Sequence, residues 1–318
     1  VAGSIKEIEE ASKQTVTDLH RPAIDKIIIP CQKCSGTAHR VREVLDSWVE
    51  AASMPYAERH YPFENETEFK QNFPADFITE YTGQLRAWFY VMHVISNALY
   101  QTNSFKNVIV TGVIMGNDGR KMSKNYGNYP DPKESLEKFG ADALRLYLMG
   151  SPIVNGQDIS ISEIDWQNQQ KTTLNLLWNS YKFFVNSASV DNWQPTNELP
   201  PQSTKLDQWI LIRLEQTLQT IEKNLESYQI PSAVSAIHPF LDDLSTWYIR
   251  RSRDRVGLSA TNKADKEYFY TTSYYLFLNF FKVIAPITPF ISEKLYRHLT
   301  DDESIHLTDW PSANQREG

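Results

Sequence analysis

The segment GNDGRKMSKNYGNYPDP, residues 116–132, combines glycines with a serine and two lysines that stand three positions apart, Lys121 and Lys124. Such ammonium groups can reach a triphosphate and neutralise charge that develops during phosphoryl or adenylyl transfer. Backbone N–H groups of a glycine-rich loop can add contacts to anions. The spacing does not fit GxxxxGK[ST], so this is not a Walker-type loop. A solvated surface loop without a ligand fits the spacing equally well.

The elements around this segment indicate how it is positioned. The apolar, β-branched run at residues 108–115 predicts a buried strand that leads into the loop. Upstream, residues 77–79 predict a short strand and residues 83–100 an amphipathic helix. Strand, helix and strand in this order are typical of a parallel sheet. After the loop, Asp131 is the expected N-cap of a helix, and residues 140–148 predict another helix.

The remainder of the chain divides into a mixed half and a helical half. Residues 1–19 predict a helix, residues 24–29 and 38–46 strands, residues 48–55 a turn, and residues 56–76 a loop. Helices are predicted at 165–189, 205–228, 230–256 and 264–299, with a proline-containing loop at 191–204. We therefore expect an α/β domain over residues 1–163, followed by an all-α domain over residues 164–318.

Composition narrows the class of protein. The 318 residues are 41% apolar and 22% charged, which is typical of a globular protein. No stretch approaches the roughly 20 apolar residues of a membrane span, so we expect no membrane contact. The net charge of −7 excludes a uniformly basic nucleic-acid coat but permits a local basic patch. The two cysteines suit a reducing compartment, and we expect the cytoplasm.

Those cysteines, Cys31 and Cys34, have the spacing of half a zinc knuckle. A complete site needs two further ligands; His39 is nearby, but the sequence has no second cysteine pair. A turn with two buried thiols is the alternative, and we expect no metal in this piece.

Four segments together resemble isoleucyl-tRNA synthetases of class I. GRKMSKN resembles the KMSKS signature of class I aminoacyl-tRNA synthetases, with Asn125 in place of the final serine. LDSWVEAASMPYA (45–57), DFITEYTGQLRAWFY (76–90) and DDLSTWYIRRSRDR (242–255) resemble isoleucyl segments in the same order. The resemblance implies the second half of a Rossmann-like catalytic domain followed by a helical anticodon-binding domain.

The resemblance also assigns roles to individual residues. Those implied for the ATP phosphates are Lys121, Ser123, Lys124 and Gly119, with Lys124 as the principal lysine. Those implied for the aminoacyl-adenylate and the isoleucine pocket are Glu80, Gln84, Trp88 and Trp48. Plain core packing is the alternative for the two tryptophans. The sequence departs from the family pattern at Val49, Glu50, Tyr81, Gly83 and Ala87, which puts the adenylate contacts in question.

The arginine-rich segment near residue 250 is implied to contact the tRNA backbone. Its residues are Trp247, Arg250, Arg251, Arg253 and Arg255. At helical spacing these arginines spread around the helix, so they do not all face one row of phosphates. The alternative is an ion-pair network with the neighbouring Asp242, Asp243 and Asp254.

The sequence contains neither a His-x-Gly-His signature nor a segment that resembles an editing domain. We therefore expect a piece of a monomeric synthetase that does not form isoleucyl-adenylate alone. The parent would use ATP with Mg²⁺, L-isoleucine and tRNA(Ile), and zinc would belong to the parent. Alternatives are a valyl or leucyl enzyme, or a non-catalytic tRNA-binding module derived from a synthetase. A generic nucleotide-binding α/β protein leaves residues 242–255 unexplained.

Overall fold

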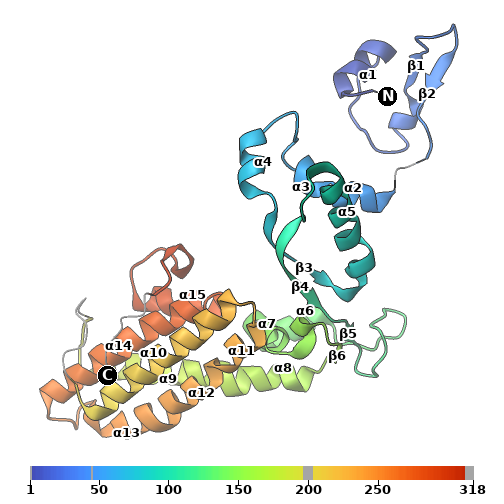
Figure 1. Ribbon diagram of the computed structural model, residues 1–318. Helices are drawn as coiled ribbons and strands as arrows, with labels where there is room; N and C mark the ends of the chain where they lie inside the picture. Colours follow the sequence, from blue (N-terminus) through green and yellow to red (C-terminus); the bar gives the residue numbers. More distant parts are fainter. Residues whose placement is uncertain (1, 44–45, 196–202, 312–318) are drawn as a thin grey trace. The chain divides into compact units, whose positions relative to one another are not determined.

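The computed structural model describes residues 2–43, 46–195 and 203–311, and the chain divides into two compact units (Figure 1). The first unit comprises Val1–Phe77 and Gly83–Asn107. The second unit comprises Ile78–Thr82 and Val108–Gly318.

The first unit opens with a helix and a hairpin. Helix α1 (Ile5–Ser12) is shorter than predicted, and the Ser4 side chain caps it by accepting a hydrogen bond from the Glu7 N–H. Strand β1 (Ile28–Pro30) pairs antiparallel with β2 (Thr37–His39). The predicted strand at 38–46 was therefore too long, and the described residues after His39 leave the pairing.

Short helices replace the turn and loop predicted for residues 48–76. They are α2 (Ser47–Ala52), α3 (Met54–Ala57) and α4 (Glu66–Asn72). Their stability comes from a cluster of aromatic rings, because isolated helices of this length are unstable in water. Phe69 is 4% exposed, and its ring lies 4.9 Å from the Phe73 ring and 5.5 Å from the Tyr100 ring. These contacts between distant residues are not visible in local sequence.

A strand, a helix and a second strand follow along the chain. Strand β3 (Ala75–Tyr81) pairs with β4 (Phe105–Thr111), and α5 (Trp88–Tyr100) connects them. The helix predicted at residues 83–100 begins only at Trp88, because Thr82–Arg86 forms a 3₁₀ turn. The prediction of strand, helix and strand is confirmed.

The predicted strand at 108–115 is interrupted at Gly112. Residues up to Thr111 belong to β4, and β5 (Ile114–Met115) instead pairs parallel with β6 (Ile159–Ser160). The Gly112 N–H donates to the Ile153 carbonyl at 2.8 Å, and a Cβ at this position would lie 2.0 Å from the Gln157 carbonyl oxygen. The close approach therefore requires glycine.

After the loop, α6 (Pro132–Phe139) and α7 (Ala141–Met149) confirm both predicted helices, including the Asp131 N-cap. Hydrogen bonds join helix α7 to the first turn of α15 (Pro289–Leu299) and to the residues just before it. The Asp142 carboxylate accepts from the Phe290 and Ile291 N–H groups at 3.2 and 2.7 Å, and the Arg145 Nε donates to the Ile287 carbonyl at 2.8 Å.

The rest of the second unit is helical, as predicted (Figure 1). Its further elements are α8 (Glu163–Gln169), a π-helical turn (Gln170–Leu174), α9 (Asn175–Val190), α10 (Lys205–Glu226), α11 (Ile230–Ser235), α12 (Ile237–Asp242), a second π-helical turn (Asp243–Ile249), α13 (Arg250–Ser252), a 3₁₀ turn (Arg253–Arg255), α14 (Lys263–Ile284) and a last 3₁₀ turn (Ile305–Leu307). The helix predicted at 264–299 is two helices, because the chain turns at residues 285–288, where Pro286 lacks an N–H.

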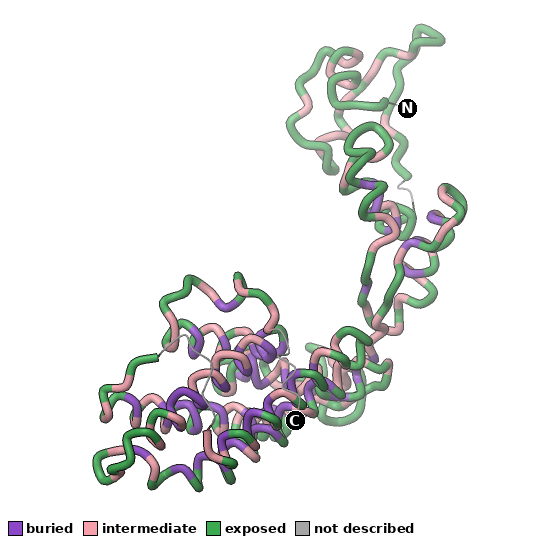
Figure 2. Tube along the Cα trace, turned by 60° about the vertical axis from the view of Figure 1, so that its left-hand side comes forward, coloured by how far each residue is buried: buried purple, intermediate pink, exposed green. Residues whose placement is uncertain are grey.

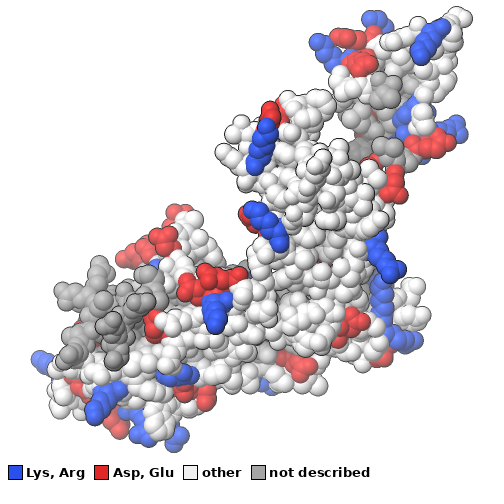
Figure 3. Space-filling model, in the orientation of Figure 1, with Lys and Arg blue, Asp and Glu red and all other residues white. Residues whose placement is uncertain are grey.

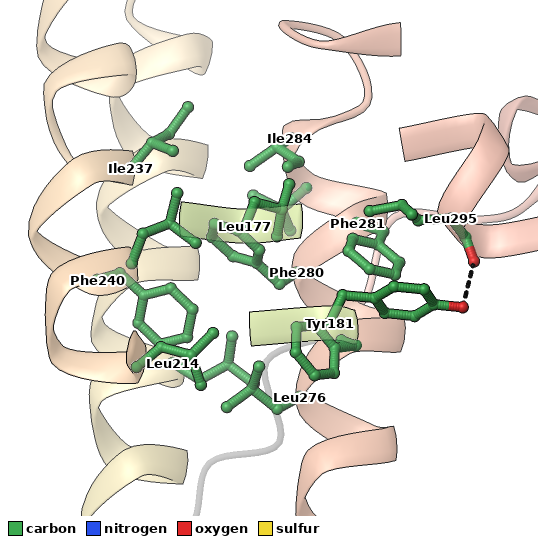
Figure 4. Close-up of a cluster of buried hydrophobic side chains, with 14 of the residues drawn as sticks. Leu177, Tyr181, Leu214, Ile237, Phe240, Leu276, Phe280, Phe281, Ile284 and Leu295 are labelled. Carbon is green, nitrogen blue, oxygen red and sulfur yellow. Dashed lines mark hydrogen bonds between the residues drawn. The ribbon is translucent and has the colours of Figure 1, made fainter. Parts of the chain in front are cut away.

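One apolar core joins these helices. Buried residues concentrate in the second unit, whereas exposed and half-buried residues predominate in the first (Figure 2). At the centre, Phe240 and Phe280 are fully buried with ring centroids 4.7 Å apart (Figure 4). The Tyr181 hydroxyl at the edge of the cluster lies 3.5 Å from the Leu295 carbonyl oxygen. No helix in the described ranges is long and apolar enough to cross a membrane.

Candidate functional site

The lysine loop, residues 116–131, connects β5 to α6 in the second unit. Lys121 and Lys124 are exposed, and neither forms an ion pair within the described part of the chain. Lys121 forms an antiparallel bridge to Met115 in β5, which fixes the point where its side chain leaves the backbone. Two unpaired ammonium groups on an anchored backbone can bind an anion with several negative oxygens.

Ser123, which stands between Lys121 and Lys124, accepts the hydrogen bonds of a tight turn over residues 123–127. Its carbonyl oxygen accepts from the Tyr126 and Gly127 N–H groups, both at 3.1 Å. Its hydroxyl oxygen accepts from the Asn125 N–H at 3.2 Å. Gly127 has a φ of +56°, which suits glycine in such a turn. Ser123 therefore contributes to the shape of the loop.

Gly119 forms a second turn in the loop. It has a φ of +74°, and its N–H donates to the Gly116 carbonyl at 3.0 Å. The expected role of Gly119 in ATP binding would therefore be to form this turn, since its N–H already has a partner.

Asn128, near the end of the lysine loop, was not predicted as a site residue from the sequence. Its side chain is buried, with 5% exposure. Its side chain contacts Asp118, Arg120, Lys121 and Ser123. Hydrogen bonds from the Asn128 amide first, and then from the Arg120 N–H, lower the pKa of Asp118 to about 2. The available signal was an asparagine among turn residues, but nothing in the sequence indicates that its amide is buried.

The two tryptophans expected in the isoleucine pocket lie on packed helices of the first unit. Trp48, on α2, is 40% exposed, which contradicts plain core packing for this residue. Trp88 is half-buried at the start of α5, and its indole Nε1 donates to the Ala51 carbonyl at 3.1 Å. The Gln84 side-chain oxygen accepts from the Trp88 N–H at 3.1 Å. Gln84 therefore holds the start of the helix that carries Trp88.

Glu80 is half-buried on β3 and belongs to the second unit, whereas Trp48, Gln84 and Trp88 belong to the first. The structure thus brings Gln84 and Trp88 into direct contact and packs α2 against α5. The lysine loop is a separate cluster of the second unit.

Cys31 and Cys34 lie in the connection between β1 and β2. The Lys33 N–H donates to the Cys31 sulfur and the Gly36 N–H to the Cys34 sulfur, both at 3.4 Å. The pKa of the Cys31 thiol is lowered, and the hydrogen bond from the Lys33 N–H contributes most to this shift. Cys34 is exposed and Cys31 partly so, which makes the alternative of two buried thiols wrong. No group of three or more potential ligands occurs among the described residues.

The arginine-rich segment contains one exposed aromatic–arginine pair. Trp247 is 47% exposed, and the Arg251 guanidinium carbon lies 3.8 Å from the centre of its ring. Arg250 and Arg253 are also exposed, and none of the three arginines forms an ion pair within the described ranges. The alternative of an ion-pair network with Asp242, Asp243 and Asp254 is therefore wrong for these three arginines. Asp243 instead pairs with Arg213 at 2.8 Å.

Arg255 is directed into the protein, which contradicts its assignment to the tRNA surface. Its side chain is 11% exposed and forms ion pairs with Asp207 at 2.7 Å and Asp265 at 2.8 Å. The fully buried Asp207 also accepts from the Tyr248 hydroxyl at 2.8 Å. Burial raises the pKa of Asp207, but hydrogen bonds from Arg255 and then Thr204 outweigh burial and keep it below its usual value. Arg255 is a structural cation.

Basic and acidic side chains are interspersed over the helices on the face that Figure 3 shows. This distribution agrees with the net charge of −7 and gives no continuous basic surface on that face.

Two family models match the parts of the chain that contain the lysine loop and the arginine-rich segment. Residues 2–162 match the family described as tRNA synthetases class I (I, L, M and V), and residues 207–317 match the anticodon-binding domain of tRNA ligases. Over 99% of its length the chain is 42% identical to the isoleucine–tRNA ligase of Treponema denticola and 41% identical to that of Protochlamydia amoebophila. It spans 30% of the length of each of these relatives.

Solved structures share the fold. A LeuRS of Agrobacterium radiobacter, in a ternary complex with tRNA and LeuAMS, matches 91% of this chain and 35% of its own with a TM-score of 0.68 and 18% identity. Mycobacterium tuberculosis methionyl-tRNA synthetase, in complex with methionyl-adenylate, matches 78% of this chain and 48% of its own with a TM-score of 0.65 and 23% identity. Since the class I match covers about half of the sequence, the chain belongs to the class I tRNA synthetase family (I, L, M and V).

Proposed function

We propose that the chain is part of an isoleucine–tRNA ligase, which activates L-isoleucine with ATP and Mg²⁺ and transfers it to tRNA(Ile). The observation that carries this proposal is the anchored loop with two unpaired lysines, in a chain similar to isoleucine–tRNA ligases over 99% of its length. Residues 1–163 form the catalytic part and residues 164–318 the anticodon-binding part. The family matches, which end at residue 162 and resume at residue 207, support this division.

The lysine loop stabilises the leaving group of amino-acid activation. The isoleucine carboxylate attacks the α-phosphorus of ATP, the aminoacyl-adenylate forms and pyrophosphate leaves. Lys124, assisted by Lys121, neutralises the charge on the phosphates, while Ser123 and Gly119 keep the loop in shape. Mg²⁺ enters with ATP and adds positive charge at the same phosphates.

Binding of Mg·ATP and of inorganic tripolyphosphate to the chain tests this role. We expect Lys124→Ala to weaken both by about tenfold, and Lys121→Ala by a smaller factor, because each removes one charge-assisted contact. Lys133→Ala is the matched control, since Lys133 is an exposed lysine of α6 outside the loop. Equal affinity for the wild type and both loop variants would contradict the proposal.

Trp48 and Trp88 form apolar walls for the isoleucine side chain, while Glu80 and Gln84 contact the adenylate. Flat aromatic walls suit a branched alkyl group, although such a pocket separates substrates that differ by one methylene by only about 10–200-fold. The choice of isoleucine as the substrate is tested by pyrophosphate exchange. The assay uses the full-length protein that contains this chain, with isoleucine, valine and leucine measured in parallel. Preferential activation of valine or leucine would replace isoleucine by that amino acid.

Trp247, Arg250, Arg251 and Arg253 form the tRNA surface, and Arg255 is excluded because its guanidinium is already paired. The stacked Trp247–Arg251 pair offers both a flat face for a base and a cation for a phosphate. We expect Arg251→Gln to reduce the salt dependence of tRNA binding by about one phosphate contact. Arg297, exposed on α15, gives the control Arg297→Gln. Unchanged salt dependence in Arg251→Gln would remove this residue from the surface.

Cys31 and Cys34 supply half of a metal site in the parent. Both sulfurs accept a backbone N–H. At Cys31 this hydrogen bond lowers the pKa of the thiol, which favours the thiolate form that zinc requires. The further ligands would have to come from outside the described residues. Zinc content of the full-length protein, compared with its Cys31→Ser variant, tests this assignment. We place the parent in the cytoplasm as a monomer.

A further inference from the structure

We infer that Asn128 is a positioning residue, which holds the backbone of the lysine loop on both sides of Lys121–Lys124 in one register. The identity of the ligand as a polyphosphate depends on the function proposed above. The positioning role itself is argued from contacts within the chain.

The Asn128 side chain makes four hydrogen bonds within the loop. Its Oδ1 accepts from the Ser123 N–H at 3.0 Å, and its Nδ2 donates to the Asp118 carboxylate at 2.9 Å. Longer contacts join Nδ2 to the carbonyl oxygens of Lys121, at 3.3 Å, and Arg120, at 3.4 Å. Only a side-chain amide offers a donor and an acceptor in this arrangement. One buried side chain therefore holds the backbone between Asp118 and Ser123, which includes Lys121 and ends one residue before Lys124.

Gly116 shows independently that the loop is built around Asn128. A Cβ at Gly116 would lie 2.4 Å from both the Nδ2 and the backbone oxygen of Asn128. The φ of Gly116 is not in the left-handed region, so the close approach of Asn128 is the reason for glycine. The Asn117 N–H also donates to the Asn128 carbonyl at 2.9 Å, which closes the base of the loop.

Asp118 sets the orientation of the Asn128 amide. Its carboxylate accepts from the Arg120 N–H at 3.0 Å and from the Arg120 Nε at 2.9 Å, in addition to Asn128 Nδ2. An ionised carboxylate accepts only, so it selects the nitrogen side of the amide and leaves Oδ1 for Ser123. The Arg120 guanidinium lies 4.7 Å from the centre of the Tyr126 ring, which ties this group to the far end of the loop.

This arrangement fixes the lysines before a ligand binds. The carbonyl of Lys121 and the N–H of Ser123 contact the same amide, and Lys124 follows directly. A backbone fixed in advance loses less conformational entropy when its side chains bind an anion. Loss of Asn128 should therefore weaken polyphosphate binding although both lysines remain. A purely structural role would instead lower the thermal stability of the second unit and leave affinity unchanged.

The test uses the 318-residue chain with two variants, Asn128→Ala and Gly116→Ala. Gly116→Ala displaces Asn128 without removing its amide, and Asn125→Ala is the control because Asn125 is an exposed loop asparagine. Three quantities are measured: the exchange rate of the Ser123 amide proton, the affinity for inorganic tripolyphosphate with Mg²⁺, and the melting temperature. We expect exchange to be roughly tenfold faster and affinity several-fold weaker in both variants, with an unchanged melting temperature.

The outcomes separate this inference from the proposed function. Unchanged Ser123 exchange in both variants overturns the inference. Faster exchange with wild-type affinity for tripolyphosphate overturns it as well, since the loop would then not need its register. If the wild type binds no tripolyphosphate, the proposed phosphate role fails. In that case the exchange rate of the Ser123 amide proton still tests the positioning role of Asn128. A faster rate in the variants supports this role, and an unchanged rate overturns it.

Discussion

The two compact units position their functional side chains by different means. In the first unit, Trp48 lies on the six-residue helix α2 and Trp88 at the start of α5, and few side chains are fully buried. In the second, a large apolar core supports the helices, and buried polar groups fix individual segments (Figure 2). Because stability is distributed unevenly in such a chain, the first unit should open more readily than the second.

The largest effect is expected from the buried ion pair of the second unit. Asp207→Ala leaves the Arg255 guanidinium without one of its two carboxylates and removes the acceptor of the Tyr248 hydroxyl. Breaking a buried pair in this way costs about 3–5 kcal/mol of the free energy of unfolding. Chemical denaturation of the second unit measures the loss. The exposed Asp301 gives the control Asp301→Ala, for which we expect almost no change.

The next effect addresses the first unit. Phe69→Ala removes the ring that stacks on Tyr61 and Phe73, and large-to-small substitutions of buried aromatic residues cost about 3–5 kcal/mol. We expect the lower end of this range, since the surrounding cluster is only partly buried and can relax. Hydrogen exchange should accelerate in residues 54–100 and stay unchanged in α14. Equal acceleration in both units would show that they unfold together.

The contrast between the units also explains how far sequence alone could lead. Long periodic helices such as α10 and α14, and the Asp131 cap, were predictable because their signals are local. The short helices between residues 47 and 72 were not, because distant aromatic contacts rather than propensity stabilise them. The family signatures, rather than local structure, are what made the lysine loop and the two tryptophans candidate site residues.

One wrong assignment, Arg255, and one omission, Asn128, have the same cause. Arg255 lies in an arginine-rich segment, but its partner Asp207 is 48 positions away, so sequence proximity suggested the wrong acidic residues. Asn128 is one of several asparagines in a polar loop, and only the folded backbone shows that its amide is buried among Asp118, Lys121 and Ser123. Partners of buried polar groups are set by tertiary structure.

A smaller effect is expected at high pH. Burial raises the pKa of Tyr181 to about 12, and burial followed by the Asp302 carboxylate raises that of Tyr296 to about 12. In the unfolded chain tyrosine ionises near pH 10. Their contribution to stability is therefore complete below about pH 10 and is lost as pH rises through about 12. Denaturation at several pH values should give a weaker alkaline dependence for Tyr181→Phe, whereas Tyr126→Phe, at an exposed site, should match the wild type.

The smallest effect comes from a matched pair of N-caps, one in each unit. The Asp46 carboxylate accepts from the Trp48 N–H at 2.9 Å and from the Val49 N–H at 3.3 Å. Asp131 accepts in the same way from the Lys133 and Glu134 N–H groups, at 2.8 and 3.3 Å. Replacing an N-cap aspartate by alanine costs about 1 kcal/mol, and asparagine retains most of the cap.

The same local loss should have different consequences at the two caps. Helix α2 has six residues and one buried side chain, Ala52, so Asp46→Ala should release α2 and change the fluorescence of Trp48. Helix α6 is followed by α7, which hydrogen bonds join to the first turn of α15 and the residues just before it. Asp131→Ala should therefore lower stability slightly without local release of α6. Hydrogen exchange in α2 and α6 of the two alanine variants, with Asp46→Asn and Asp131→Asn as controls, measures the difference. Equal release of both helices would mean that the cap, rather than the supporting core, decides whether a short helix stays folded.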